Sequence, residues 1–303
     1  MAAGGHEEDG MGFDIELLLL ALTPLFLLCV ALEILYWRRH GRAGIYDGRA
    51  GIYDWRDSLC SAALGLMHQG ADKLAWLLVL PVYAWVWQHR LFDFQIGWPA
   101  FVALFVAQDF LYYGFHRASH RVRWLWAAHS VHHSSTRMNF TTAFRQSLMY
   151  PVAGMWLFWL PLAWLGFPPE AVVGVVLVNL AFQFFVHTQA IPRLGVLEKV
   201  FNTPSIHRVH HAKNPRYLDR NYAGVLVVWD RLFGSYVEED AAEPCDYGTV
   251  KPVASFNPLW VTLTEWIDMA REVARARSWQ EARVLLFGPP EAAERVAASG
   301  NSR

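Results

Sequence analysis

Histidines are the residues of this chain whose type and spacing could bind metal ions. The pattern H-x-x-H-H occurs twice, and an H-x-x-x-H pair precedes it. The eight histidines of these clusters are His116 and His120; His129, His132 and His133; and His207, His210 and His211. Residues three and four apart share one face of a helix, so each first histidine is expected beside the later ones. Ordinary core or surface histidines would not repeat this spacing.

The ligand set indicates two metal ions bound by imidazole. A structural zinc site uses four ligands, often including cysteine, whereas eight clustered histidines exceed that number. None of the clusters contains Cys, Asp or Glu. Imidazole suits iron, zinc, copper and nickel, so spacing alone does not name the metal.

Two further histidines stand alone and are interpreted differently. His187 follows Asn179 and Gln183 at four-residue intervals, which forms a polar stripe on an apolar segment. Such a stripe is expected to face protein or a cavity, and it makes His187 a ninth candidate ligand. His68 has no such neighbours, and we expect it to be packed or hydrogen-bonded rather than bound to metal.

Composition favours a membrane protein over a soluble one. The chain has 303 residues, of which 54% are hydrophobic and 17% charged, with 15 Trp and 19 Phe in long apolar runs. The net charge of −1 gives no indication of a nucleic-acid partner. The three cysteines are scattered and are expected to be free.

The apolar runs predict an all-α integral membrane protein with about five transmembrane helices. The expected spans are 15–37, 58–87, 98–115, 146–165 and 171–186. The acidic segment 1–12 lacks the positive region of a signal peptide. Arginines after the first and third spans place 38–57, 116–146 and 188–303 in the cytoplasm. This orientation puts every histidine cluster, and His187, on the cytoplasmic face.

Flanking segments complete the expected organisation. GRAGIYD at 41–47 repeats at 48–54 and is expected only to lengthen a loop. Thr203 and Pro204 predict the start of the helix that carries the last cluster. We expect an N-terminal segment at 1–57, a catalytic domain at 58–250 and a peripheral helical tail at 251–303.

Acidic and aromatic residues near the first cluster are candidates for supporting roles. Asp109, Tyr113, His116 and His120 follow one another at spacings of four, three and four, which places them on one helical face. An aspartate in a membrane helix is costly unless it is paired or functional. It could orient a ligand histidine, and the alternative is a packing partner for Arg117 or a tyrosine.

These patterns together resemble the fatty acid hydroxylase/sterol desaturase superfamily, and most of all its alkylglycerol monooxygenase-like branch. The resemblance covers roughly 55–250. It is carried by the histidine clusters and by Asp109–His120, His129–Ser135, Asn139–Ser147, Asn202–Ser205, Asn221–Gly224 and Trp229–Gly234. It implies a metal site of the eight clustered histidines plus His187, with Asp109, Tyr113 and Asn139 as candidate catalytic residues.

The activity that the resemblance implies is oxidation of a lipid C–H bond. It implies two iron ions, O2 as co-substrate and an external electron donor, which could be a tetrahydropterin or a redox protein. Members of the superfamily hydroxylate, desaturate or cleave ethers, so a sterol or fatty-acid desaturase or hydroxylase is the alternative to an ether-lipid monooxygenase. A membrane metal transporter or zinc hydrolase is a more remote alternative, because a transporter needs ionisable groups across the bilayer and a hydrolase a carboxylate base.

Overall fold

The structure is a computed structural model that describes residues 16–41 and 51–301, and it is helical in architecture. The α-helices and 3-10 helices (η) are α1 (Glu16–Arg39), α2 (Trp55–Gln88), α3 (Trp98–Arg121), α4 (Arg123–His133), η1 (Phe140–Phe144), α5 (Tyr150–Ala153), η2 (Met155–Phe158), α6 (Leu160–Leu165), α7 (Pro169–Phe184), η3 (Gly195–Lys199), α8 (Pro204–His210), α9 (Val228–Leu232), α10 (Pro258–Ala274), α11 (Trp279–Phe287) and α12 (Pro290–Asn301). Across the described ranges, β-pairing is limited to isolated bridges. The expected all-α class is confirmed.

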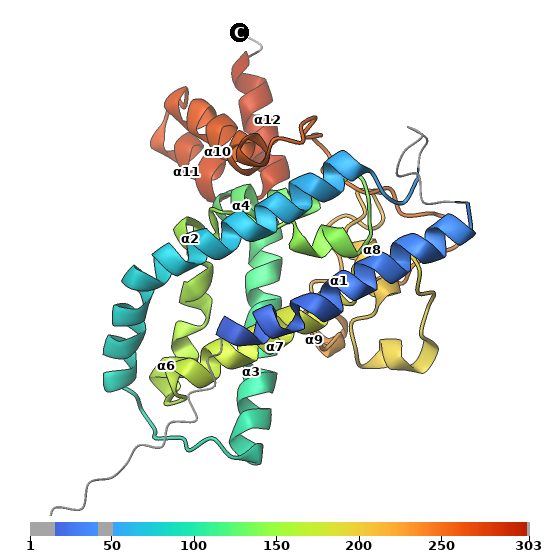
Figure 1. Cartoon of the computed structure of the whole chain (residues 1–303). Coiled ribbons are helices and arrows are strands. Elements are labelled where there is room, and N and C mark those ends of the chain that lie inside the picture. The colour runs from blue at the N-terminus through green and yellow to red at the C-terminus, as the bar shows by residue number, and fades with distance from the viewer. Residues whose placement is uncertain (1–15, 42–50, 302–303) are drawn as a thin grey trace, which may run out of the picture.

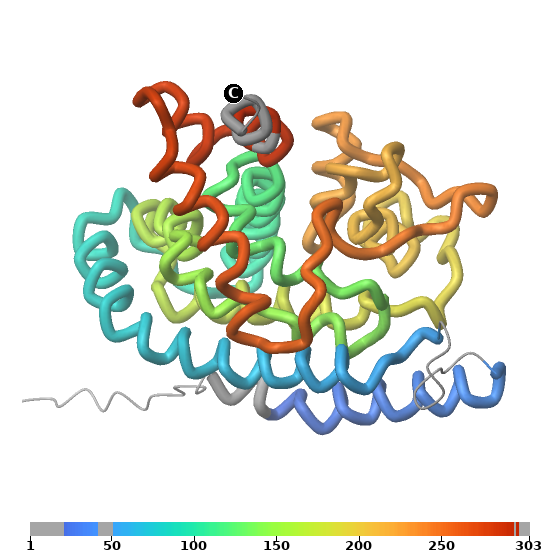
Figure 2. Tube along the Cα trace, turned by 90° about the horizontal axis from the view of Figure 1, so that it is seen from above, coloured from blue at the N-terminus to red at the C-terminus, as the bar shows by residue number. Residues whose placement is uncertain are grey.

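The long helices enclose an apolar core. Packing of α2 on α6 and of α3 on α7 buries the largest hydrophobic cluster, which includes Tyr83, Leu104, Leu162 and Val175. Figure 2 shows α1 and α2 running along one edge of the molecule. The helix α1 packs on α7 and η1, so the N-terminal helix joins the histidine-bearing part directly.

Membrane-spanning character is clear for one helix of the described chain. Ala21–Arg39 is long and apolar enough to cross a membrane, judged by length and composition. Met155–Leu165 and Pro169–Phe184 are shorter apolar segments. Leu27, Leu32, Leu77 and Leu78 on α1 and α2 are more than half exposed, which leaves apolar side chains available to lipid.

The expected fourth span is not one continuous helix. Residues 146–165 form α5, η2 and α6, with a left-handed Gly154 between the first two. Pro151 and Pro161 stand in the first turns of α5 and α6, where a missing N–H is tolerated. The apolar composition led to the expectation of a single helix, but Gly154 and the prolines restart the helix twice.

The C-terminal helices pack on the helix that carries the second histidine cluster. Both α10 and α11 contact α4, and Figure 1 shows α10 to α12 together at one end of the molecule. Arg123, at the start of α4, is buried and pairs with Glu265 at 3.0 Å and with Glu272. Its backbone N–H donates to the Gly288 carbonyl at 3.0 Å. The tail therefore supports α4 from outside.

The repeated heptapeptide ends in ordered structure. Most of its first copy lies outside the described residues, but the end of the second copy is packed. Tyr53 is buried, and the Asp54 carboxylate caps α2 by accepting the Arg56 N–H at 2.8 Å. Residues 51–54 lie outside the helices, in agreement with the expected loop, and their last residue also caps α2.

Candidate metal centre

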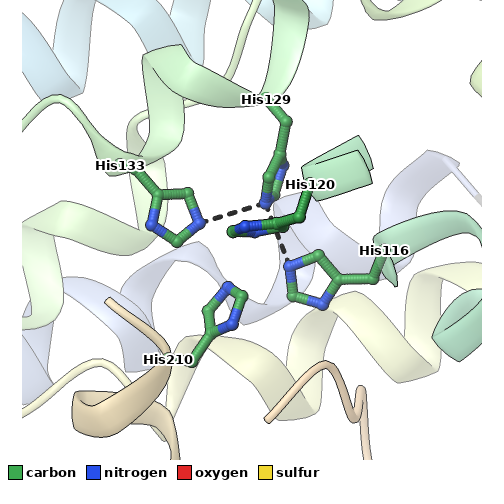
Figure 3. Close-up of side chains that lie close together, drawn as sticks. All are labelled: His116, His120, His129, His133 and His210. Atoms are coloured by element: carbon green, nitrogen blue, oxygen red, sulfur yellow. Dashed lines mark hydrogen bonds between the residues drawn. The ribbon is translucent and has the colours of Figure 1, made fainter. Parts of the chain in front are cut away.

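Five histidines from three helices form the first group, which we call group A. Its members are His116 and His120 on α3, His129 and His133 on α4, and His210 on α8. All five are buried, and their converging ring nitrogens lie within 4.8 Å of one another (Figure 3). The Nε2 atom of His129 is 3.0 Å from that of His116 and 3.1 Å from that of His133.

Four further histidines form group B beside it. They are His132 on α4, His187 after α7, His207 on α8, and His211, which caps α8. Their converging nitrogens also lie within 4.8 Å of one another. The Nε2 atom of His187 is 3.1 Å from that of His132 and 3.0 Å from that of His207. The lone His187 thus lies with clustered histidines, as the polar stripe predicted.

Each H-x-x-H-H pattern is divided between the two groups. On α4, His129 and His133 belong to group A, whereas His132 belongs to group B. The first histidine of each pattern still lies beside both later ones, as expected, since the ring centroid of His129 is 5.6 and 4.8 Å from those of His132 and His133. Positions i and i+4 lie about 40° apart and point to one group, while i+3 lies about 60° to the other side of i and points to the other group. The rings of His133 and His211 stack across the boundary, with centroids 4.4 Å apart.

A short loop holds three imidazoles of group A. The Nδ1 atoms of His116 and His210 lie 2.9 and 3.0 Å from the carbonyls of Tyr222 and Arg220. The Nδ1 atom of His120 lies 3.3 Å from the Asp219 carboxylate. Residues 219 and 221 have φ of 57°, a conformation that Asp and Asn adopt more readily than most residues. The only sequence signal for this loop was the spacing D-x-N at 219–221.

Carbonyl oxygens anchor two imidazoles of group B. Nδ1 of His132 is 3.2 Å from the Arg145 carbonyl, and Nδ1 of His187 is 2.6 Å from the Gln183 carbonyl. A carbonyl can only accept, so each Nδ1 carries the proton and each Nε2 presents a lone pair. The lone pairs of His132 and His187 therefore face each other at 3.1 Å with no proton between them. A cation between them would remove this repulsion.

Other atoms of the site also fit bound metal. The Nε2 atoms of His120 and His210 are buried without a hydrogen-bond partner. Two nitrogens bound to one ion at about 2.1 Å would be roughly 3.0–3.4 Å apart, in agreement with the Nε2 separations of 3.0 and 3.1 Å. Burial, followed by the charge of neighbouring imidazoles, holds the pKa of His133 and His211 well below its ordinary value. Neutral imidazole is the form that binds a metal.

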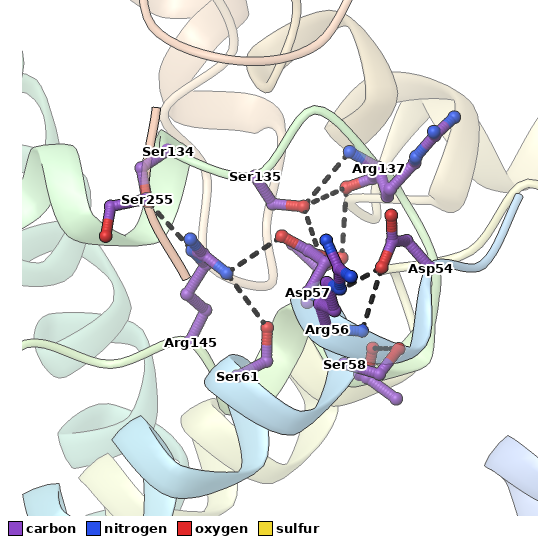
Figure 4. A network of polar contacts seen from close by, with 12 residues as sticks. Asp54, Arg56, Asp57, Ser58, Ser61, Ser134, Ser135, Arg137, Arg145 and Ser255 are labelled. Carbon is purple, nitrogen blue, oxygen red and sulfur yellow. Dashed lines mark hydrogen bonds and ion pairs between the residues drawn. The ribbon is translucent and has the colours of Figure 1, made fainter. Parts of the chain in front are cut away.

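A buried ion pair fixes the segment that orients His132. Arg145 and Asp57 are 1% and 4% exposed, and the guanidinium donates to the carboxylate at 3.0 Å (Figure 4). The Arg145 Nε–H also donates to Ser134 at 2.8 Å, next to the histidines of α4. Because a buried ion pair is costly to break, it holds the N-terminus of α2 against α4.

Asp109 does not contact a histidine. Its carboxylate accepts hydrogen bonds from the backbone N–H groups of Val225 and Leu226 at 2.8 and 3.0 Å, and from the indole of Trp229 at 2.9 Å. It also accepts from the Asn179 amide at 2.9 Å. Asp109 therefore does not orient a histidine directly. It anchors the segment after Tyr222, and the Tyr222 carbonyl in turn contacts His116.

The polar stripe on α7 faces α3. Gln183 donates to Asn179 at 2.6 Å and accepts from Tyr112 at 2.7 Å. Gly224 packs against this stripe, and a Cβ at that position would lie 2.7 Å from the Asn179 side-chain oxygen. The stripe therefore faces protein, as expected, and its end positions His187 through the Gln183 carbonyl.

Tyr113 and Asn139 lie in hydrogen-bond networks outside both groups. The Tyr113 hydroxyl is 3.0 Å from the Ser235 hydroxyl and accepts from Arg117 at 3.0 Å. Asn139 caps η1 and donates to the Ile52 carbonyl at 2.8 Å. His68, expected to be hydrogen-bonded, lies 3.0 Å from the Ser147 carbonyl and 3.3 Å from Asp72.

Two side chains near the histidines were not predicted from the sequence. The Tyr150 hydroxyl is 2.8 Å from Nδ1 of His129. Glu33, buried in α1, accepts from Thr188, from the Phe140 N–H at 2.9 Å and from Tyr53. Thr188 directly follows His187, so this carboxylate ties α1 to group B. A charged residue within an apolar helix was the available signal.

Comparison with known proteins agrees with this geometry. Residues 101–235 match the family model described as fatty acid hydroxylase. This segment is a fatty acid hydroxylase family domain. It contains all nine histidines of groups A and B.

The curated relatives extend the similarity beyond the domain. The chain is 38% identical to alkylglycerol monooxygenase of Homo sapiens over 79% of this chain and 52% of that protein. It is 36% identical to alkylglycerol monooxygenase of Danio rerio over 78% of this chain and 51% of that protein. It is 31% identical to an ornithine lipid hydroxylase of Rhizobium tropici over 49% of this chain and 45% of that protein. The chain thus spans about half the length of these relatives. No solved structure matches it.

Proposed function

We propose that this chain is a membrane-bound di-iron oxygenase that oxidises a C–H bond of a lipid. Groups A and B would each hold one iron ion, with O2 as co-substrate. The facing lone pairs of His132 and His187 carry the metal assignment. Similarity to alkylglycerol monooxygenases and an ornithine lipid hydroxylase supports the oxygenase assignment. Bound iron would supply the oxygen chemistry, which protein side chains alone do not perform.

The protein's own contribution is to hold neutral imidazoles in place and to keep the site dry. All nine histidines are at most 6% exposed. Tyr112, Phe115 and Trp159 form an aromatic layer packed beside His116. Asp109, Tyr113 and Asn139, the candidate catalytic residues, would act by positioning the segments that bear ligands and their partners. An aromatic, water-poor surrounding suits an unactivated alkyl chain.

We propose an ether lipid as the substrate class, because the alkylglycerol monooxygenases match over most of this chain. A sterol or fatty-acid hydroxylase or desaturase is the alternative. The reductant would be an external tetrahydropterin or redox protein. Assays that supply each reductant with an alkylglycerol, a fatty acyl lipid and a sterol would distinguish these possibilities by product mass.

The proposed placement is an integral, multi-pass membrane protein with both groups on the cytoplasmic face. The catalytic part would occupy 58–250, between an N-terminal segment at 1–57 and a peripheral tail at 251–303. Although 146–165 is a broken helix, a helical hairpin with α7 would still reach the opposite face. Reporter fusions at Gly97 and Gly166 are expected to give an outside signal, and one at Ser235 an inside signal. An inside signal at Gly166 would exclude this topology.

Metal analysis with oxygen uptake tests the central proposal. Protein purified after expression with adequate iron should contain about two metal ions per chain and consume O2 when lipid and reductant are present. Total metal must be counted, since zinc can replace iron at imidazole sites. Zinc-dependent hydrolysis would support a hydrolase, and metal flux without oxygen uptake would support a transporter. Either result would overturn the proposal.

A further inference from the structure

A protruding surface of the chain exposes large apolar side chains beside cations. It consists of residues 193–201, which include η3, and residues 228–233, which include α9; we call it the ledge. Val196 and Leu232 are 71% and 68% exposed. The other large exposed hydrophobic side chains of the ledge are Leu194, Leu197, Val200, Phe201, Val228 and Phe233. Water is a poor environment for so many apolar side chains in two short segments.

The two segments of the ledge are fixed to one another. An isolated antiparallel bridge joins Phe201 to Leu226, and the Val227 N–H donates to the Val200 carbonyl at 2.9 Å. The Arg231 guanidinium donates to the Glu198 carbonyl at 3.1 Å, which links α9 to η3. The exposed side chains therefore belong to a built surface, which in Figure 1 lies on the side of the molecule away from α10 to α12.

Buried Glu198 holds η3 in place from below. Its carboxylate accepts from the Leu194 N–H at 2.8 Å and from the Ser205 hydroxyl at 2.6 Å. Ser205 lies on α8, two residues before His207, so the ledge is braced against the helix that carries the last histidine cluster. The one carboxylate within η3 is thus turned inward, and its neighbours present apolar and cationic groups outward.

Cations surround a cavity in the ledge. Arg193, Lys199 and Arg231 line a cavity of about 460 Å³ together with Tyr236 and two glutamates. Arg193 pairs with both Glu198 and Glu238, at 3.2 and 2.9 Å. The Arg231 guanidinium lies over the Tyr236 ring, 3.8 Å from its centroid. Three cations against two carboxylates leave one positive charge, which favours an anionic group at the edge of the apolar side chains.

The apolar surface also continues onto α3. Phe110, which is 42% exposed on α3, packs against Trp229 and Phe233 with ring centroids 5.0 and 6.3 Å apart. The exposed face of α3, with Val102 and Val106, is therefore continuous with α9. Since 98–115 is a proposed membrane span, the ledge would lie where that span leaves the bilayer.

We propose that the ledge is an interfacial contact with the bilayer, in which its apolar side chains enter the acyl region and its cations bind lipid phosphates. Exposed apolar side chains bordered by basic side chains are typical of segments that lie in the membrane interface. The proposal rests on the membrane placement proposed above. It adds a second attachment, close to α8, which would hold the metal centre at a fixed position relative to the cytoplasmic face of the membrane.

Photocrosslinking in lipid nanodiscs tests this contact. The full chain would carry p-benzoylphenylalanine in place of Val196 or, in a second variant, Leu232, where high exposure leaves room for a larger ring. Irradiation followed by mass spectrometry should give lipid adducts at both positions. The same probe in place of Trp279, which is 74% exposed on α11, is the control and should give none. Adducts only with a second protein chain, or no lipid adduct at either ledge position, would overturn the proposal.

Charge variants test the phosphate contact separately. In discs with phosphatidylglycerol, Lys199→Gln should lower the lipid-adduct yield at residue 196 by about threefold, since each basic residue near an anionic surface contributes to attraction. Lys199→Arg should keep the yield, and Arg283→Gln on α11 should leave it unchanged. Equal adduct yields for Lys199→Gln and the parent chain would contradict the proposed contact between Lys199 and lipid phosphate. Adduct formation requires neither iron nor turnover, so an inactive chain that still forms adducts would contradict only the proposed function.

Discussion

Groups A and B consist of the same type of side chain but are supported in different ways. Group A has five imidazoles, and three of them are held by the segment 219–222. Group B has four, and the Nδ1 atoms of His132 and His187 contact the carbonyls of Arg145 and Gln183. The Nδ1 atom of His207 is buried without a partner. Fewer protein ligands leave more coordination positions open, so we expect group B to bind its ion less tightly and to offer more room for O2.

The largest expected effect comes from removing one ligand of each group on the same helix. His210→Ala should affect group A, and His211→Ala group B. Each should lower activity by more than about 100-fold, the upper end for loss of a supporting residue. Metal should fall from about two ions per chain to about one, and thermal stability should fall because metal binding contributes to folding. Metal analysis and a melting curve of each variant measure both effects.

The results for His210→Ala and His211→Ala decide how far the two groups differ in metal affinity. His211→Ala is expected to retain its remaining ion, in group A, against a chelator that removes the remaining ion, in group B, from His210→Ala. A fully active metal-free His210→Ala protein would contradict the metal assignment. Equal chelator resistance of the two variants would contradict the ranking of the groups.

His187 tests whether group B needs its ligand from outside the clusters. His187→Ala should reduce bound metal to about one ion per chain and reduce activity as strongly as a cluster mutation. The control is His68→Ala, which removes a buried histidine that lies near Ser147 and Asp72. Full metal and activity in His187→Ala would show that the polar stripe of α7 serves packing alone.

Asp219 tests the special support of group A. Asp219→Gly tolerates the φ of 57° but removes the carboxylate near His120, so activity should fall by about 10- to 100-fold. Asp219→Asn keeps a hydrogen-bond acceptor, so its activity should fall less. Arg121→Gln removes the exposed partner of the same carboxylate and serves as control. An unchanged metal content and activity in Asp219→Gly would limit the support of group A to the backbone carbonyls.

Glu33 provides the smallest expected effect, on group B. Glu33→Gln retains an acceptor but places an NH2 group among donors, so stability should fall by about 1–3 kcal/mol for an unsatisfied buried donor. Activity should fall by roughly tenfold through displacement of Thr188 and His187, the lower end for a supporting residue. Glu170→Gln, on the exposed first turn of α7, is the matched control. If the melting temperature falls while group B keeps its ion and activity, Glu33 serves stability only.

The sequence alone determined the helical class and the set of histidines that converge. Apolar runs and turn residues are local signals, so the positions of α1, α2, α3 and α7 followed from them with small errors at the ends. The H-x-x-H-H repeats, the H-x-x-x-H pair and the α7 stripe likewise named all nine imidazoles. Thr203 and Pro204 correctly predicted where α8 begins.

Only the tertiary structure decided how the nine histidines divide and what supports them. The sequence spacing places His129, His132 and His133 on neighbouring faces, but the contacts between the imidazoles of α4 and those of 207–211 set which of them share a group. Glu33, Tyr150 and Asp219 approach the histidines across 21 to 155 positions of sequence, so no local pattern could assign their partners. The same holds for Asp109, because its donors at 225 and 226 reach it only when the chain returns to α3.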